Sequence, residues 1–150
     1  MGGIFWPLLG VVVGGFLAVQ APVNAELSRN LGMPVAAAGI SFFVGAVVLG
    51  LITLVMVTTQ TAPPLNWRAP PLWMFLLGGF LGASFVTCNI LLVPRLGAAS
   101  LMAFLITGQL IAGLLVDRFG AFGLAVREIT MGRIAGVILL LAGALLVRFA

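Results

Sequence analysis

Five long runs of apolar residues dominate this sequence and limit what it can fold into. Each is close to or above the roughly 20 residues that an α-helix needs to cross the core of a bilayer. Charged residues make up only 7% of the chain, whereas soluble domains carry about a quarter. The sequence therefore predicts an all-α membrane protein, a single domain over residues 1–150 built as a five-transmembrane-helix bundle. The predicted helices cover about residues 4–28, 34–57, 72–93, 98–116 and 130–148.

The breaks between these runs are typical of loops at a membrane surface. Residues 58–71 (TTQTAPPLNWRAPP) contain four prolines, which a helix interior does not tolerate, and Trp67, which suits the interfacial region. We interpret residues 119–129 as a second loop or as a segment lying in the interface. No basic segment precedes the first run, so we expect it to be a span of the mature protein and not a signal peptide.

The cationic residues are all arginines, and they divide almost evenly between the two sides of the membrane. Five spans place the termini on opposite sides. Basic residues near helix ends set orientation, so a small bias predicts dual topology, in which oppositely oriented copies pair as an antiparallel homodimer. The alternative is that membrane insertion fixes one orientation regardless. One side receives Arg68, Arg118, Arg127 and Arg133, and the other receives Arg29, Arg95 and Arg148.

The composition also excludes several classes of function. The net charge of +4 is not gathered into a basic patch, so we expect no nucleic-acid partner. Cys88 is the one cysteine and no metal-ligand spacing occurs, so we expect no disulfide, no metal and no other cofactor. The chain has no His, no Tyr and no pair of carboxylates in mid-span, which leaves few groups for acid–base or nucleophilic chemistry. We therefore expect that it is not an enzyme.

Carboxamides inside the apolar runs are the candidate substrate-binding residues, because an unpaired polar group in a membrane helix costs roughly a few kcal/mol. Gln20 and Asn24 are four residues apart and share one helix face. Pro22 between them lacks the N–H that would bond the carbonyl of Ala18. The pair either binds a neutral polar ligand or bonds neighbouring helices, and the residues favour neither. The four candidates are Gln20, Asn24, Asn89 and Gln109.

The sequence around the other two carboxamides, Asn89 and Gln109, says less about their roles. Gln109 lies near the middle of the fourth run, and we interpret it as lining a pocket. Asn89 lies beside a glycine groove and faces either a cavity or a partner helix. Thr107 lies on a different face from Gln109, and we expect its hydroxyl to bond a backbone carbonyl of its own helix.

No Asp or Glu lies in mid-span. Glu26 follows Asn24 near Arg29, and Asp117 closes the fourth run beside Arg118. We interpret both carboxylates first as members of interfacial ion pairs, which contribute little to stability. They are also the candidate ion-coupling residues, and Glu26 is the stronger of the two because it continues the polar end of the first run.

Glycines recur at a spacing of four residues in three of the runs. Small residues at this spacing let helix backbones approach closely in lipid, where apolar packing has no hydrophobic driving force. We interpret these positions as helix-packing sites without assigning a partner to any of them. They are Gly10 and Gly14, Gly78 and Gly82, and Gly132 and Gly136.

Four stretches resemble a known family of membrane proteins. They look like the YdcZ-type family of inner-membrane exporters, in the drug/metabolite transporter superfamily, and the similarity covers nearly the whole chain. One departure is that the family pattern leads us to expect His after the aspartate, where this chain has Arg118, so the resemblance assigns no proton relay to that corner. The stretches are QAPVNAELSRNLGMPVAAAGISFFVG, GASFVTCNILLVPRLGAA, GQLIAGLLVDRFGAFG and MGRIAGVILLLAGALLVR.

The resemblance implies an architecture and a location. Members of the family are five-helix units that resemble half of a ten-helix transporter built from inverted repeats. Two copies would then form the working unit, either as an antiparallel homodimer or with an oppositely oriented paralogue. The resemblance implies a multi-pass protein of the bacterial cytoplasmic (inner) membrane, whose partners are the lipid bilayer and a small-molecule substrate.

These observations together favour a small membrane transporter that exports its substrate by alternating access. A mid-span acid is absent, which argues against a dedicated exporter of organic cations and for a neutral or amphiphilic substrate. The alternatives are a dual-topology passive channel lined by carboxamides and exposed carbonyls and a structural membrane subunit. Saturating flux would distinguish the transporter from the channel.

Overall fold

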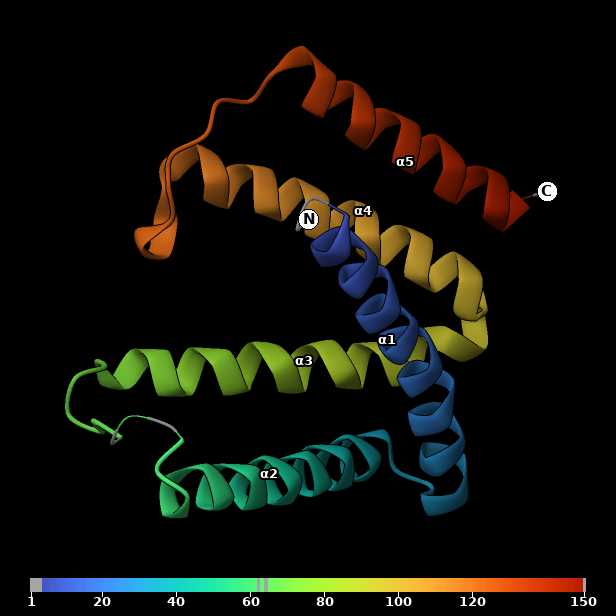
Figure 1. Ribbon diagram of the computed structural model, residues 1–150. Helices are drawn as coiled ribbons and strands as arrows, with labels where there is room; N and C mark the ends of the chain where they lie inside the picture. The colour runs from blue at the N-terminus through green and yellow to red at the C-terminus, as the bar shows by residue number, and fades with distance from the viewer. Residues whose placement is uncertain (1–3, 62, 64, 150) are drawn as a thin grey trace. The chain divides into compact units, whose positions relative to one another are not determined.

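The computed structural model describes residues 4–61, 63 and 65–149, and the long elements in that part of the chain are all α-helices. Each of the five is long and apolar enough to cross a membrane. The predicted fold class, all-α with five transmembrane helices, is confirmed. The helices are α1 (Phe5–Leu31), α2 (Pro34–Thr58), α3 (Leu72–Leu96), α4 (Ala98–Phe119) and α5 (Met131–Phe149), with a 3-10 helix, η1 (Ala121–Gly123), before the last (Figure 1).

Three helices, α1, α3 and α4, each continue three residues beyond the ends that the apolar runs indicated. α1 passes Ser28 and stops at Gly32, whose φ of 73° is a left-handed conformation that glycine adopts at low cost. α3 continues through Pro94 into its last turn, where a proline removes only one backbone hydrogen bond. α4 passes Asp117 and ends at Gly120, which is again left-handed. The polar residues at these ends therefore belong to the helices and not to loops.

The proline-rich connection after α2 is a loop, as predicted. Within residues 58–71, residues 62 and 64 lie outside the described part, and the described residues after Thr58 form turns, bends and irregular chain. Trp67 in this segment is largely exposed. The side chains exposed along the helices are mainly large and apolar, which is the surface expected where lipid is the solvent.

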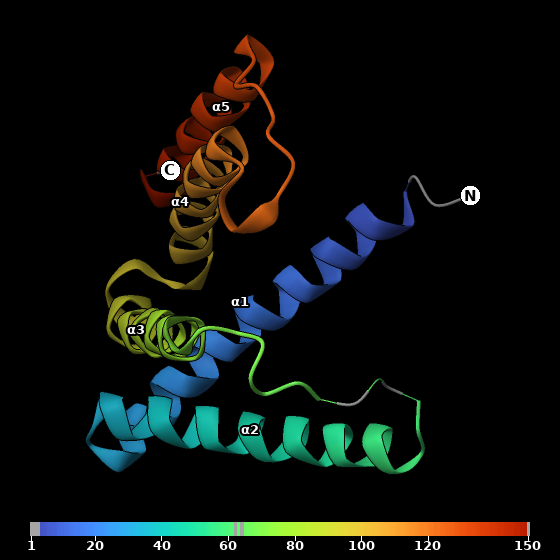
Figure 2. The same ribbon diagram turned by 90° about the vertical axis from the view of Figure 1, so that its left-hand side faces the viewer.

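The chain divides into two compact units, the first ending at Leu91 and the second beginning at Leu92. The prediction of a single membrane domain stays a prediction. In the first unit, α1 packs on α2 across the short connection at Gly32 and Met33. Figure 2 looks along the axis of α3 and across that of α2, so these two helices cross and do not run parallel. Alanines in the core of this unit allow that close crossing; the core consists of Ala37, Ala38, Val86 and Ile90, with Leu27 and Phe85 packed against it.

One predicted packing glycine lies at this crossing. A Cβ built on Gly82 of α3 would lie 3.1 Å from Cζ and 3.3 Å from Cε1 of Phe42 in α2. Gly82 therefore gives the aromatic ring room to lie against α3. A Cβ at Gly10, Gly14, Gly78 or Gly136 would meet no atom within 4 Å, and one at Gly132 would lie 3.9 Å from Thr130 Oγ1.

The second unit is a hairpin of α4 and α5, which lie side by side in Figures 1 and 2. The connection turns at Gly120, whose φ of 59° is left-handed and where a Cβ would lie 2.7 Å from the side chain of Val126, so any other residue would be strained there. The N–H of Arg127 donates to the carbonyl of Asp117 over 2.9 Å, which ties the connection to the end of α4. Thr130 Oγ1 accepts from the N–H of Arg133 over 3.4 Å and caps the start of α5.

Candidate functional site

The face that Gln20 and Asn24 share on α1 is directed toward α2. Asn24 is buried, and its Nδ2 donates a hydrogen bond to Oγ of Ser41 over 3.3 Å. This hydrogen bond is a contact between α1 and α2, so Asn24 bonds a neighbouring helix. Asn24 and Ser41 lie equally far from the turn at Gly32 and Met33, so they lie opposite each other where α1 and α2 leave that turn.

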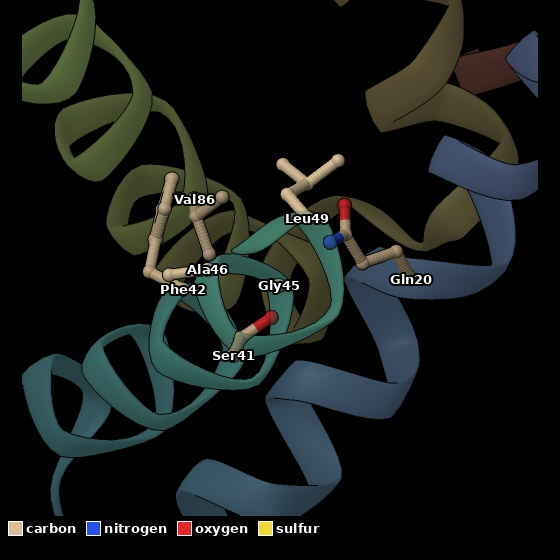
Figure 3. A pocket seen from close by; sticks show the side chains of 7 residues that line it. All are labelled: Gln20, Ser41, Phe42, Gly45, Ala46, Leu49 and Val86. Atoms are coloured by element: carbon tan, nitrogen blue, oxygen red, sulfur yellow. The ribbon is translucent and has the colours of Figure 1, made fainter. Parts of the chain in front are cut away.

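Gln20 lies one helical turn before Asn24 and lines a cavity of about 310 Å³. Figure 3 shows its carboxamide extending from α1 toward α2 near Leu49, with Phe42 and Val86 at the opposite side of the view. Ser41 lines the same cavity. Ser41 thus accepts a hydrogen bond from Asn24 and also lines the cavity that Gln20 lines.

The chemistry of this cavity is neutral. Gln20 and Ser41 supply amide and hydroxyl groups, each able to donate and to accept hydrogen bonds. The remaining lining residues are apolar or glycine, and none of the lining residues carries a charge: Phe42, Gly45, Ala46, Leu49 and Val86. A cavity that is mainly apolar with a few polar groups is the usual form of a small-molecule site.

Asn89 takes a different position in the first unit. It is buried in α3, next to the core residue Ile90, and is not among the residues that line the Gln20 cavity. In the part of the chain that the structure describes, its Oδ1 has no hydrogen-bond partner. An unsatisfied buried acceptor costs about 1–3 kcal/mol. The choice between a cavity position and a helix contact for Asn89 stays open.

The polar residues of α4 meet α5 at a second cavity, of about 390 Å³. Gln109 and Asp117 line it together with Arg133 of α5. Asp117 Oδ2 and Arg133 Nη1 are 3.2 Å apart, and both side chains are about one-third exposed (33% and 30%). Asp117 is therefore a member of an ion pair, as interpreted from the sequence, but its partner is Arg133 across the hairpin and not the adjacent Arg118.

Glu26 forms the predicted ion pair with Arg29 on the exposed face of α1, and it accepts a hydrogen bond from Asn30 Nδ2 over 3.5 Å. The side chains of Glu26 and Arg29 are 55% and 67% exposed. Glu26 does not line the Gln20 cavity, although it follows Asn24 closely in sequence. The predicted bond of Thr107 is confirmed, since its hydroxyl donates to the carbonyl of Ala103 over 2.9 Å.

Ser41 and Arg133 are the partners that the sequence interpretation did not identify. Both could have been found from the topology, because each lies opposite a candidate residue across a helical hairpin. Ser41 is the hydroxyl in α2 opposite Asn24, and Arg133 is the cation in the first turn of α5, at the same end of the hairpin as Asp117.

In the described residues, five helices are long and apolar enough to cross a membrane, which defines the class as a multi-pass membrane protein. The chain belongs to the family described as "Putative inner membrane exporter, YdcZ", which matches residues 5–146. It is a multi-pass protein of the inner membrane. The resemblance inferred from the sequence is thus confirmed.

A curated relative is the "Inner membrane protein YdcZ" of Escherichia coli (strain K12), which is 43% identical over 75 residues. The aligned stretch is 50% of this chain and 50% of the relative, so the chain spans about half the length of the curated relative it matches. No solved structure matches the chain significantly.

Proposed function

We propose that this protein exports a neutral or amphiphilic small molecule across the inner membrane by alternating access. The observation that carries the proposal is the cavity of about 310 Å³ in which Gln20 and Ser41 provide polar groups among apolar neighbours. Carboxamide and hydroxyl groups recognise a polar ligand without requiring that it carry a charge. The exporter family to which the chain belongs supports the direction of transport.

The proposed working unit is an antiparallel homodimer of copies with opposite orientation. The nearly even distribution of arginines between the two sides supports dual topology. Secondary transporters often consist of inverted repeats with the substrate site at their interface. A second copy would place another Gln20 and Ser41 across a two-fold axis, so that one ligand could be held from both sides.

The proposal is tested with the purified full-length protein and a library of uncharged and amphiphilic compounds. Compounds that raise the midpoint of thermal unfolding are then measured for uptake into proteoliposomes. We expect uptake that saturates with concentration and proceeds at low turnover. Flux that stays proportional to concentration at near-diffusive rates, or single-channel current, would instead establish a passive channel.

A double variant separates transport from a structural role. Gln20→Ala combined with Gln109→Ala removes the carboxamide from each of the two cavities. We expect this variant to fold and insert but to lose uptake of the compounds identified in the screen. Full retention of uptake in a folded double variant would contradict a role for these carboxamides and favour a structural subunit.

A further inference from the structure

The cavity between α4 and α5 differs in chemistry from the Gln20 cavity. It contains a carboxylate, a guanidinium and a carboxamide, from Asp117, Arg133 and Gln109. The rest of its lining is apolar or glycine: Leu110, Gly113, Leu114 and Gly136. The cavity therefore has a charged end and an apolar wall, and its two charges cancel.

The ion pair in this cavity has capacity for further hydrogen bonds. One contact joins the pair, between Arg133 Nη1 and Asp117 Oδ2 over 3.2 Å. A guanidinium carries five N–H donors and a carboxylate has two acceptor oxygens, so most of both groups is available to a ligand. Because the side chains are 30% and 33% exposed, a ligand can reach them.

The position of the pair along the helices indicates the depth of the ligand. Asp117 lies in the last turn of α4, and Arg133 lies in the first turn of α5. Charged residues at the ends of spanning helices lie at the level of the lipid head groups. Gln109 is about two turns further into α4, on the apolar side of the cavity. The cavity thus runs from the head-group region toward the hydrocarbon.

We propose that this cavity binds a phosphoethanolamine group, a zwitterion that carries a primary ammonium and a phosphate. The ammonium donates to the carboxylate of Asp117, and the phosphate accepts from the guanidinium of Arg133, which holds phosphate oxygens well. A wholly anionic group would be repelled by Asp117, and a wholly cationic group by Arg133. A zwitterion matches both charges, and any attached chain lies along Leu110 and Leu114. This inference does not depend on the proposed transport through the Gln20 cavity.

The test uses the purified full-length protein in detergent micelles and measures the midpoint of thermal unfolding against concentration of each probe. The probes are dioctanoyl-phosphatidylethanolamine, the corresponding phosphatidylcholine and phosphatidylglycerol, and free phosphoethanolamine. We expect phosphatidylethanolamine to raise the midpoint saturably and to bind about tenfold more tightly than the other two lipids, because choline cannot donate a hydrogen bond and glycerol has no positive charge. An equal response to phosphatidylethanolamine and phosphatidylglycerol would overturn the proposal.

Free phosphoethanolamine distinguishes the two sources of the ligand. A saturable response to it shows that the zwitterion alone is sufficient, so the natural ligand can be a soluble molecule. A response only to the lipid shows that the acyl chains are required and that the ligand is a membrane lipid. Absence of a response to both the lipid and the free zwitterion would refute the site.

Two variants separate ligand binding from the structural role of the ion pair. Gly136→Leu fills the cavity but leaves Asp117 and Arg133 unchanged, and a Cβ at this position meets no atom within 4 Å. We expect it to abolish the response to phosphatidylethanolamine. Gly10→Leu is the matched control in α1, where a Cβ also meets no atom within 4 Å, and it should retain the response. If Gly136→Leu does not fold, Gly113→Leu is used in its place, and a full response in either folded variant contradicts the proposal.

Discussion

Asn24 in α1 donates a hydrogen bond from Nδ2 to Oγ of Ser41 in α2, over 3.3 Å. The bond joins two consecutive helices at the edge of the cavity that Gln20 and Ser41 line. One carboxamide of the i, i+4 pair therefore bonds the neighbouring helix, and the other lines a cavity. The structure thus shows helix contact for Asn24, while ligand binding by Gln20 is our proposal.

The Asn24–Ser41 bond should contribute a measurable coupling energy to folding. We expect a double-mutant cycle of Asn24→Leu and Ser41→Ala to give about 0.6–1 kcal/mol, the usual size for side-chain hydrogen bonds between membrane helices. Reversible unfolding in mixed micelles provides the free energies. Ser84→Ala, an exposed serine in α3, is the matched control and should change stability little. A coupling energy near zero would show that the contact does not stabilise the hairpin.

Replacement of Gln20 should affect ligand binding more than stability. Gln20 is exposed to its cavity, so Gln20→Ala should weaken binding of compounds found in the screen by about tenfold with little change in the unfolding midpoint. Val19→Ala removes side-chain volume at the same depth from a position that is 64% exposed, and should bind normally. Equal affinities of the Gln20→Ala and Val19→Ala variants, measured by ligand titration, would exclude Gln20 from the site.

The neutral character of this cavity gives a prediction about specificity. Gln20→Glu introduces a carboxylate beside Ser41, where none of the lining residues carries a charge. We expect the variant to bind uncharged compounds less tightly and to gain affinity for monovalent organic cations such as tetraphenylphosphonium, because an opposite charge in a low-dielectric site is strongly attractive. Titration of wild type and variant with both kinds of compound measures the change. An unchanged preference would place the ligand elsewhere.

Alanine should change the free energy of unfolding differently at Gly78 and at Gly82, because only Gly82 lies against the ring of Phe42. An alanine in a helix is more stable than glycine by roughly 0.5–1 kcal/mol, so Gly78→Ala, with no atom within 4 Å of its Cβ, should stabilise α3. Gly82→Ala brings Cβ within 3.1 Å of the Phe42 ring, and crowding should cancel that gain or exceed it. Adding Phe42→Leu to Gly82→Ala should restore the gain. The measurement is the free energy of unfolding of the wild type, Gly78→Ala, Gly82→Ala and the double variant. Equal stabilisation by alanine at both glycines would show that the Phe42 ring moves aside freely.

Added positive charges should fix the orientation of the chain. With Cys88, the one native cysteine, replaced by serine, a cysteine at each terminus should be labelled from both sides of the membrane. Thr61→Arg with Leu65→Arg biases one side, and Asn30→Arg with Met33→Arg biases the other. Each biased variant alone should lose transport, and co-expression of the two should restore it. If the labelled chain without added arginines reacts from only one side of the membrane, dual topology is ruled out.

The helices could be predicted from sequence because long apolar runs have no alternative to helical structure in a bilayer. The ends of the helices were harder to predict, because Pro94 and Asp117 interrupt the apolar runs without ending the helices. The partners of individual side chains were hardest to predict, since they depend on how each helix is rotated about its axis. Asn24 was recognised as a candidate, but its contact with Ser41 requires the register across the turn at Gly32.

The left-handed residue Gly32 and the extended residue Met33 make a connection of only two residues between α1 and α2. So short a link keeps the end of α1 and the start of α2 at the same surface of the membrane, so the orientation of one spanning helix determines that of the other. The Asn24–Ser41 hydrogen bond lies within this pair of helices. Its formation therefore requires no residue from α3, α4 or α5.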